Sequence, residues 1–352
     1  MEFDSSLPIK ERILKRRRQK RKRLIIVGLF LFAILISSAV AMNKDAAAGK
    51  EAEAQTVSAG VVTDEKIPGG EKEEAVLESE PGQPDGEPAA GNADFTPPAP
   101  VSKDLGGLKQ AIEQYIKGYT GTYGVYYSNL ATGEEFGINH TEVYTAASTF
   151  KIPLNLYLFE KIKSGSVRRE GTLTYLKQDY EEGAGQIQYE KAGKKYTVCE
   201  LSRLSIEVSD NVAANILIRF LGKSNIKSYM RKCGGIVVKE EENVSCPKDM
   251  ALYMKLVNDF SNKSGTLGQE LMGYFLNTEQ NDRITARLPG SVKVAHKTGN
   301  QLNVIHDVGI VFARQTYVLA VMSKEANEGE ANDVIASVSK MVYDYVEKNG
   351  KK

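Results

Sequence analysis

The chain of 352 residues has few cysteines, few histidines and no excess of charge of either sign. Three cysteines exclude a disulfide-rich miniprotein, and three scattered histidines argue against a histidine-based metal site. The 46 lysines and arginines nearly balance the 45 aspartates and glutamates, so the net charge of +1 gives no reason to expect a nucleic-acid partner. We expect no metal and no other cofactor. Length alone allows two domains.

The charges are strongly segregated near the N-terminus. Residues 1–42 hold 10 basic and 3 acidic side chains, whereas residues 43–100 hold 4 and 13. The basic residues lie between Lys10 and Arg23, and an uncharged run of 19 residues follows from Leu24 to Met42. As a helix this run would span roughly 28 Å, about the hydrocarbon core of a bilayer. The pattern predicts a cytoplasmic tail at 1–23, a transmembrane anchor at 24–42 and an extracytoplasmic remainder, hence a single-pass protein of the cell membrane.

A cleaved signal peptide is the alternative to the anchor. Ala39-Val40-Ala41 fits a small-x-small cleavage site, and cleavage after Ala41 would give a secreted protein. The apolar run is longer than the roughly 7–15 residues of a signal-peptide core, which favours the anchor.

Residues 43–100 contain seven of the eleven prolines and seven glycines, with Phe95 as their only aromatic residue. Such a composition predicts a disordered, acidic linker.

Residues 101–352 carry the periodic patterns of one folded domain, with 32 basic and 29 acidic residues. At the start of the domain we expect a helix at 105–119 and strands at 122–130 and 135–138. A helical region should follow, with one helix that has Ile152, Leu156, Phe159 and Ile162 on one face, one opened by the capping box Thr197-x-x-Glu200, and one at 212–221. Near the C-terminus we expect strands at 292–296, 305–313 and 317–323 and a closing helix through 334–345. Strands at both ends of the domain with helices between them predict an α+β fold, with an antiparallel sheet, flanking terminal helices and an all-helical lobe.

The first motif with chemical content is Ser148-Thr149-Phe150-Lys151. A serine and a lysine three residues apart on a helix lie on the same face, within hydrogen-bonding reach. A lysine kept neutral by burial can accept the proton of the serine hydroxyl and so activate it as a nucleophile. Ser-x-x-Lys occurs four times in the chain, and context separates the copy at Ser148, which stands at a predicted helix start and is followed by an apolar face.

Two further triplets are weak alone. Ser209-Asp210-Asn211 lies between two predicted helices, where Asp210 is a good N-cap; alternatively the turn presents a hydroxyl and an amide to a cleft. The triplet Lys297-Thr298-Gly299 is expected at the end of a strand, where a cation and a hydroxyl could face a cleft and Gly299 would allow a ligand to approach. Similar triplets begin at Lys163 and Lys263, at a helix end and in a polar loop.

The order and spacing of these motifs resemble the penicillin-recognising serine enzymes, and the class A β-lactamase family most closely. Ser209 follows Ser148 by 61 residues, and Lys297 follows Ser209 by 88. Further segments similar to that family are Thr197-Val198-x-Glu200-Leu201, Val208 to Asn215, Arg283-Ile284, Leu288-Pro289 and Val294 to Gly299. The resemblance covers most of residues 105–350.

The resemblance implies a role for each motif residue. Ser148 would form an acyl-enzyme, Lys151 would be its base, Ser209 would pass a proton to the departing nitrogen, and Lys297 would tune Ser209 and attract an anionic substrate. The residues implied in substrate binding are Asn211, Thr298, Gly299, Asn300 and Arg283. The N–H of Asn300 would complete an oxyanion hole with that of Ser148. Arg283 matches an arginine that some family members use to anchor a carboxylate. A structural role is the alternative for Arg283, and it is the expected role for His306.

One departure from the family concerns turnover. Between Ser209 and Pro247 the chain is about fifteen residues shorter than the family pattern, and it lacks the Glu-x-x-Leu-Asn segment whose glutamate activates the deacylating water. Glu240, Glu241 and Glu242 lie in the shortened loop, but such runs are usually solvated. We therefore expect acylation with slow hydrolysis.

Cys233 and Cys246 bracket this loop, and a disulfide between them is a further hypothesis.

Three functions remain open from the sequence. The first is a membrane-anchored serine hydrolase of the β-lactamase type that is acylated by β-lactams. The second is a D-Ala-D-Ala peptidase or esterase acting on cell-wall peptides, for which the missing glutamate is no handicap. The third is a non-catalytic ectodomain that senses β-lactams or the cell wall. The complete set of Ser148, Lys151, Ser209 and Lys297 favours the enzymes, since a binding module does not need all four.

Overall fold

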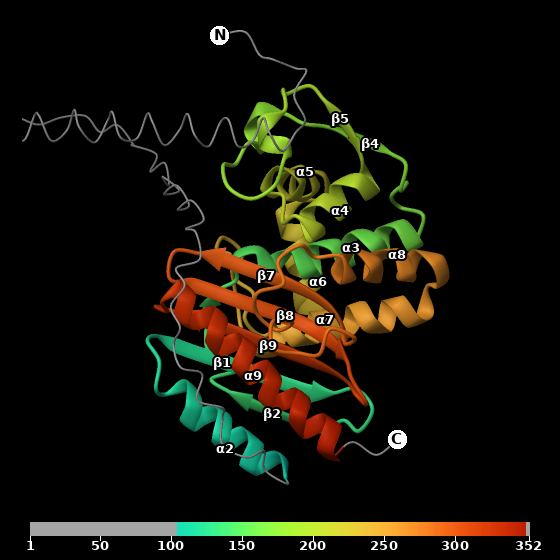
Figure 1. The fold of residues 1–352 in the computed structure, drawn as a ribbon. Helices are drawn as coiled ribbons and strands as arrows, with labels where there is room; N and C mark the ends of the chain where they lie inside the picture. Colours follow the sequence, from blue (N-terminus) through green and yellow to red (C-terminus); the bar gives the residue numbers. More distant parts are fainter. Residues whose placement is uncertain (1–103, 350–352) are drawn as a thin grey trace, which may run out of the picture. The chain divides into compact units, whose positions relative to one another are not determined.

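The computed structural model describes residues 104–349, and the predicted tail, anchor and linker lie outside this part. Within it, no helix is both long and apolar enough to cross a bilayer. A five-stranded sheet of order β2-β1-β9-β8-β7 forms the frame, and every pair of neighbouring strands is antiparallel (Figure 1). Its strands are β1 (Thr122–Asn129), β2 (Glu135–Ile138), β7 (Lys293–Gln301), β8 (Val304–Phe312) and β9 (Thr316–Lys324).

Alternation along the strands explains why both faces of the sheet are covered. In β9, Leu319 and Val321 pack in a cluster with the two terminal helices, α2 (Leu105–Ile116) and α9 (Glu328–Asn349). The residues that alternate with them, Ala320 and Met322, pack in a second cluster with the helical lobe. Side chains of successive strand residues point to opposite faces, so β9 is apolar throughout because it is buried on both sides.

The helical lobe lies between the strands of the two chain ends, as the sequence predicts. It consists of α3 (Lys151–Lys163), α4 (Val198–Glu207), α5 (Asn211–Leu221), α6 (Lys223–Lys232), α7 (Pro247–Lys263) and α8 (Gly265–Leu276), together with the small pairs β3 (Tyr144–Thr145) with β6 (Val244–Ser245) and β4 (Thr172–Thr174) with β5 (Lys195–Thr197). Thr197 caps α4 by accepting from Glu200 N, and α5 ends at Gly222, whose φ of +83° suits glycine.

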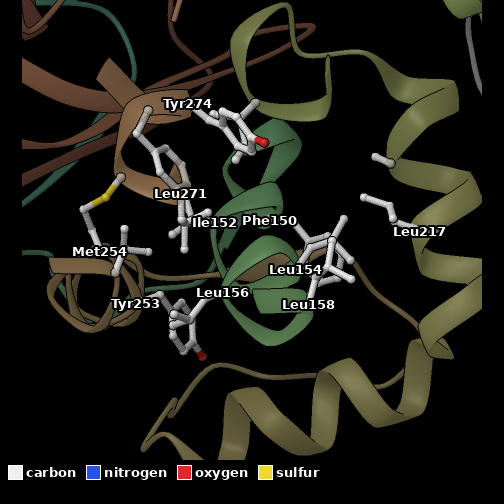
Figure 2. Close-up of a cluster of buried hydrophobic side chains, with 14 of the residues drawn as sticks. Phe150, Ile152, Leu154, Leu156, Leu158, Leu217, Tyr253, Met254, Leu271 and Tyr274 are labelled. Carbon is white, nitrogen blue, oxygen red and sulfur yellow. The ribbon is translucent and has the colours of Figure 1, made fainter. Parts of the chain in front are cut away.

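The N-terminal part of the helix α3, from Lys151 to Phe159, is packed among other helices, whereas Glu160 and Lys163 near its end are exposed. Figure 2 shows apolar residues of α3 pointing in different directions, among them Ile152, Leu154, Leu156 and Leu158, toward α5, α7 and α8. A helix that is apolar all round is a central helix rather than a surface one. The packing fixes the first turn of α3, which carries Lys151, inside a rigid core.

Two predictions are wrong in detail. The sequence places the end of a strand before Lys297, whereas β7 runs on to Gln301 because its ladder with β8 continues through Gly299 opposite His306. The disulfide is also absent: the three cysteines are free thiols. Cys246 is buried and caps α7, where its Sγ accepts from Asp249 N at 3.5 Å, and burial raises the pKa of the Cys233 thiol at the end of α6.

Candidate active site

The candidate nucleophile stands on a tight turn between β3 and α3. Ser148 belongs to a 3₁₀ turn, Ala147–Phe150, that leads directly into α3, so the predicted helix start is shifted by one turn. Ala147 has a φ of +46°, a conformation that residues with a Cβ rarely adopt. The Thr149 hydroxyl closes the turn by donating to Ala146 O at 2.5 Å. Such local strain is typical of functional turns held by their surroundings.

Lys151 brings the predicted serines together. Its Nζ lies 3.1 Å from Ser148 Oγ and 3.3 Å from Ser209 Oγ. It also donates to Ser209 O and to Asn211 Oδ1, at 2.8 Å each. Lys151 therefore links Ser148 of the first motif to Ser209 and Asn211 of the second, although about sixty residues separate the two motifs in the chain.

Lys297 completes the cluster from the sheet. Its Nζ lies 3.0 Å from Ser209 Oγ and donates to Thr298 O at 3.0 Å. The side chain of Lys297 is fully buried, so its amino group contacts Ser209 without access to bulk water. Ser209 itself has a φ of +54°, a second non-glycine residue in the left-handed region within this site.

Burial sets the protonation of both lysines. Loss of hydration lowers the pKa of Lys151 to about 8, against the weaker opposing charges of Glu181 and Asp210. Burial also lowers the pKa of Lys297 well below its ordinary value, and the charge of Lys151 acts in the same direction. A low-dielectric environment penalises the charged form of an amine. Near neutral pH an appreciable fraction of Lys151 can therefore be uncharged and able to accept a proton.

Asp210 fills the structural role that the sequence left open for it. Its Oδ1 caps α5 by accepting from Ala213 N at 2.9 Å. Its Oδ2 accepts from Gln186 N at 2.7 Å and Ile187 N at 2.8 Å, and so binds the loop that precedes β5. The middle residue of the triplet is thus a buried scaffold, while Ser209 and Asn211 on either side of it reach Lys151.

Gly299 accommodates the nucleophile turn rather than only a ligand. A Cβ at this position would lie 3.2 Å from Thr149 Cγ2 and 3.3 Å from Ala146 O, which is a crowded approach. The absence of a side chain lets β7 pack against the turn that carries Ser148, with Asn300 as the next residue of the strand. Thr298 donates its hydroxyl proton to Gln280 Oε1, a partner that no sequence motif singled out.

Arg283 contacts the main chain of β7, the strand that carries the triplet, through its Nη1, which lies 3.5 Å from Gly299 O. Its side chain is 1% exposed. Its Nη1 donates to His306 O at 2.8 Å and its Nε to Asn332 Oδ1 at 2.8 Å, which ties β8 to α9. These contacts give Arg283 the structural role named as the alternative, and its carboxylate-binding role stays a prediction.

The shortened loop offers main chain and an amide to the site instead of a carboxylate. Its acidic side chains form exposed ion pairs, Glu240 with Arg231, Glu241 with Lys223 and Glu242 with Lys239, at 2.9, 3.0 and 2.9 Å. Asn243 O accepts from Ala146 N at 2.7 Å, and Asn243 Nδ2 donates to Ala147 O at 3.2 Å. The loop therefore rests directly on the nucleophile turn, and the three glutamates are solvated as expected.

The comparisons with known proteins agree with this geometry. A model described as the β-lactamase enzyme family matches residues 107–346. The chain belongs to the β-lactamase enzyme family. Its relatives include β-lactamase ROB-1 of Haemophilus influenzae, 25% identical over 267 residues that cover 69% of this chain and 85% of the relative. The carbapenem-hydrolysing β-lactamase KPC of Klebsiella oxytoca is 24% identical, covering 66% and 86%.

Solved structures share the fold of this chain. PBP-A superposes with a TM-score of 0.66 at 29% identity, over 71% of this chain and 99% of that one. A mutant of PBP-A, similar at a TM-score of 0.65 and 29% identity, was solved as an acyl-enzyme complex with penicillin G. The prediction of a class A β-lactamase-like serine hydrolase with an α+β fold is therefore confirmed. This leaves the two enzymatic functions of the three considered.

The lowered pKa of Lys151 predicts how acylation depends on pH. Only the uncharged amine can take the Ser148 proton, so the second-order rate constant for acylation by a reporter penicillin should rise with pH and reach half its maximum near pH 8. The measurement is stopped-flow acylation between pH 6 and 10. Lys151→Arg, whose guanidinium stays charged throughout, should lose roughly 10²–10⁴-fold at every pH. A flat profile in the unaltered protein would show that Lys151 is not the base.

Proposed function

We propose that this protein is acylated by β-lactams at Ser148 and releases the product slowly. The observation that carries the proposal is the position of Lys151 Nζ, within 3.3 Å of both Ser148 Oγ and Ser209 Oγ. A single amine in contact with two hydroxyls can take a proton from the nucleophile and return it toward the leaving group.

The reaction follows from the contacts in two steps. The Ser148 Oγ–H proton passes to Lys151 Nζ as Oγ bonds to the lactam carbonyl carbon, and the main-chain N–H groups of Ser148 and Asn300 bind the resulting oxyanion. The C–N bond then breaks, and the departing nitrogen takes a proton from Ser209 Oγ. Lys151, at 3.3 Å, replaces that proton, while Lys297 at 3.0 Å holds the hydroxyl in place.

The same residues can bind the substrate. Asn211 uses its Oδ1 on Lys151, which leaves its amide N–H groups for a substrate amide carbonyl. Thr298 would bind a substrate carboxylate when its hydroxyl turns away from Gln280 Oε1, and Gly299 keeps the strand close to the nucleophile. We infer slow release because, among the described residues, no carboxylate hydrogen bonds to Ser148, and the glutamates of the shortened loop are engaged in surface ion pairs.

A D-Ala-D-Ala peptidase or esterase activity on cell-wall peptides is the second candidate function. The same acylation machinery serves both substrates, and a shortened loop without a water-activating glutamate matters less for a slow peptidase. Similarity to PBP-A over 71% of this chain supports it.

We further propose that the domain is held outside the cell by a single-pass anchor at residues 24–42, on the basis of the basic flank and the uncharged run.

Turnover of nitrocefin should show a burst followed by a slow phase. The burst should equal one product molecule per protein molecule, since each Ser148 is acylated once before release limits the rate. Ser148→Ala should abolish the burst. Ser224→Ala, which alters the serine of another Ser-x-x-Lys sequence on α6, should leave it intact. Rapid steady-state hydrolysis with no burst would contradict slow release, and a burst in Ser148→Ala would contradict the nucleophile.

The anchor is tested on the full chain. Expressed in bacteria, the protein should sediment with membranes, its mature mass should include residues 1–42, and protease added outside the cytoplasmic membrane should remove the catalytic domain. A soluble extracytoplasmic protein that begins after Ala41 would show that the apolar run is a signal peptide instead.

A further inference from the structure

His306 is a buried histidine next to the site that the proposed chemistry does not use. It lies on β8, directly opposite Gly299 of β7 in the sheet register, and is 0% exposed. Its Nδ1 lies 3.0 Å from Ser323 N, and its Nε2 lies 2.6 Å from Thr145 O. The ring therefore joins the neighbouring strands β8 and β9 to β3, the distant strand that precedes the nucleophile.

The two contacts fix the state of the imidazole. A main-chain N–H can only donate, so Nδ1 accepts from Ser323 and the ring proton must be on Nε2, which donates to Thr145 O. Burial lowers the pKa of His306 to about 4, although its contacts with the backbone oppose this. The ring is therefore neutral, in one tautomer, throughout the range in which Lys151 loses its proton.

The contact with Thr145 acts on the turn that carries the nucleophile. Thr145 precedes Ser148 by three residues and is followed by Ala146, whose carbonyl accepts the Thr149 hydroxyl. On the sheet side, a Cβ at Gly299 would lie 3.3 Å from His306 Cδ2. The ring thus lies beside the place where Gly299 of β7 packs against the nucleophile turn, and its Nε2–H holds Thr145, just before that turn, on the sheet.

We propose that His306 is a positioning residue that sets the separation between the nucleophile turn and β7. That separation determines where Ser148 Oγ and the Ser148 N–H lie relative to the N–H of Asn300, the two donors of the oxyanion hole. The inference rests on the proposed function, because a role in positioning has meaning only if Ser148 is acylated. Displacement of a reacting group by about 1 Å can cost roughly 10²-fold in rate.

Two substitutions separate the contacts of the ring. His306→Asn keeps an acceptor near the Nδ1 position for Ser323 N–H but has no donor long enough to reach Thr145. His306→Gln keeps a distal N–H for Thr145. For acylation by a fluorescent penicillin, we expect the maximal rate constant to fall roughly 10–100-fold in His306→Asn and to stay within about fivefold in His306→Gln. The constant for reversible binding before acylation should change less in both.

A matched control separates positioning from stability. Val311→Ala, on the same strand, removes volume from the cluster on the opposite face and does not touch the nucleophile turn. At a comparable fall in Tm, it should acylate at the rate of the unaltered protein. The inference is overturned if His306→Asn acylates at the unaltered rate, if His306→Gln is as slow as His306→Asn, or if Val311→Ala loses the same activity. No acylation of the unaltered protein would overturn the proposed function, and this inference with it.

Discussion

An amine removed from water and surrounded by oxygens is the constraint on which the site depends. Lys151 lies inside the helical lobe, and its Nζ contacts Ser148, Ser209 and Asn211. The desolvation that makes a buried ammonium group costly also lowers the pKa of the lysine, so one physical effect both destabilises the charged form and creates the base. The polar contacts make the burial tolerable, because a buried amine without partners would cost far more.

The rest of the fold serves to keep those oxygens in place. The buried N-terminal part of α3 fixes Lys151, and the cap of Asp210 fixes the start of α5, which carries Asn211. Ser209 and Ala147 are held at positive φ, a local cost that the surrounding contacts offset. The sheet adds Lys297 from β7 as a second amine in contact with Ser209. The site therefore forms where the sheet edge meets the helical lobe, and neither part contains it alone.

Much of this arrangement could be predicted from the sequence, and the failures have physical causes. Alternating and continuous apolar runs identify the strands, and the spacing of Ser148, Ser209 and Lys297 identifies the residues that meet. The full length of β7 could not be predicted, since its continuation through Gly299 depends on pairing with a distant strand. The cysteine pair failed because closeness in sequence does not fix where a thiol points: Cys246 faces the core as a cap. The role of Gln280 depends on a loop that meets Thr298 from 18 residues away, and that of His306 on a contact with Thr145 across 161 residues; neither contact leaves a local pattern.

The most direct test of the account is the titration of Lys151 itself. In protein labelled with ¹³C at the lysine Cε positions, the Lys151 signal can be assigned as the one lost in Lys151→Arg, and its chemical shift can be followed from pH 6 to pH 12. The account predicts a midpoint near pH 8, set by burial. A midpoint near the ordinary lysine value of about 10.4 would mean that the amine is charged at neutral pH, and Lys151 could then not be the base that activates Ser148.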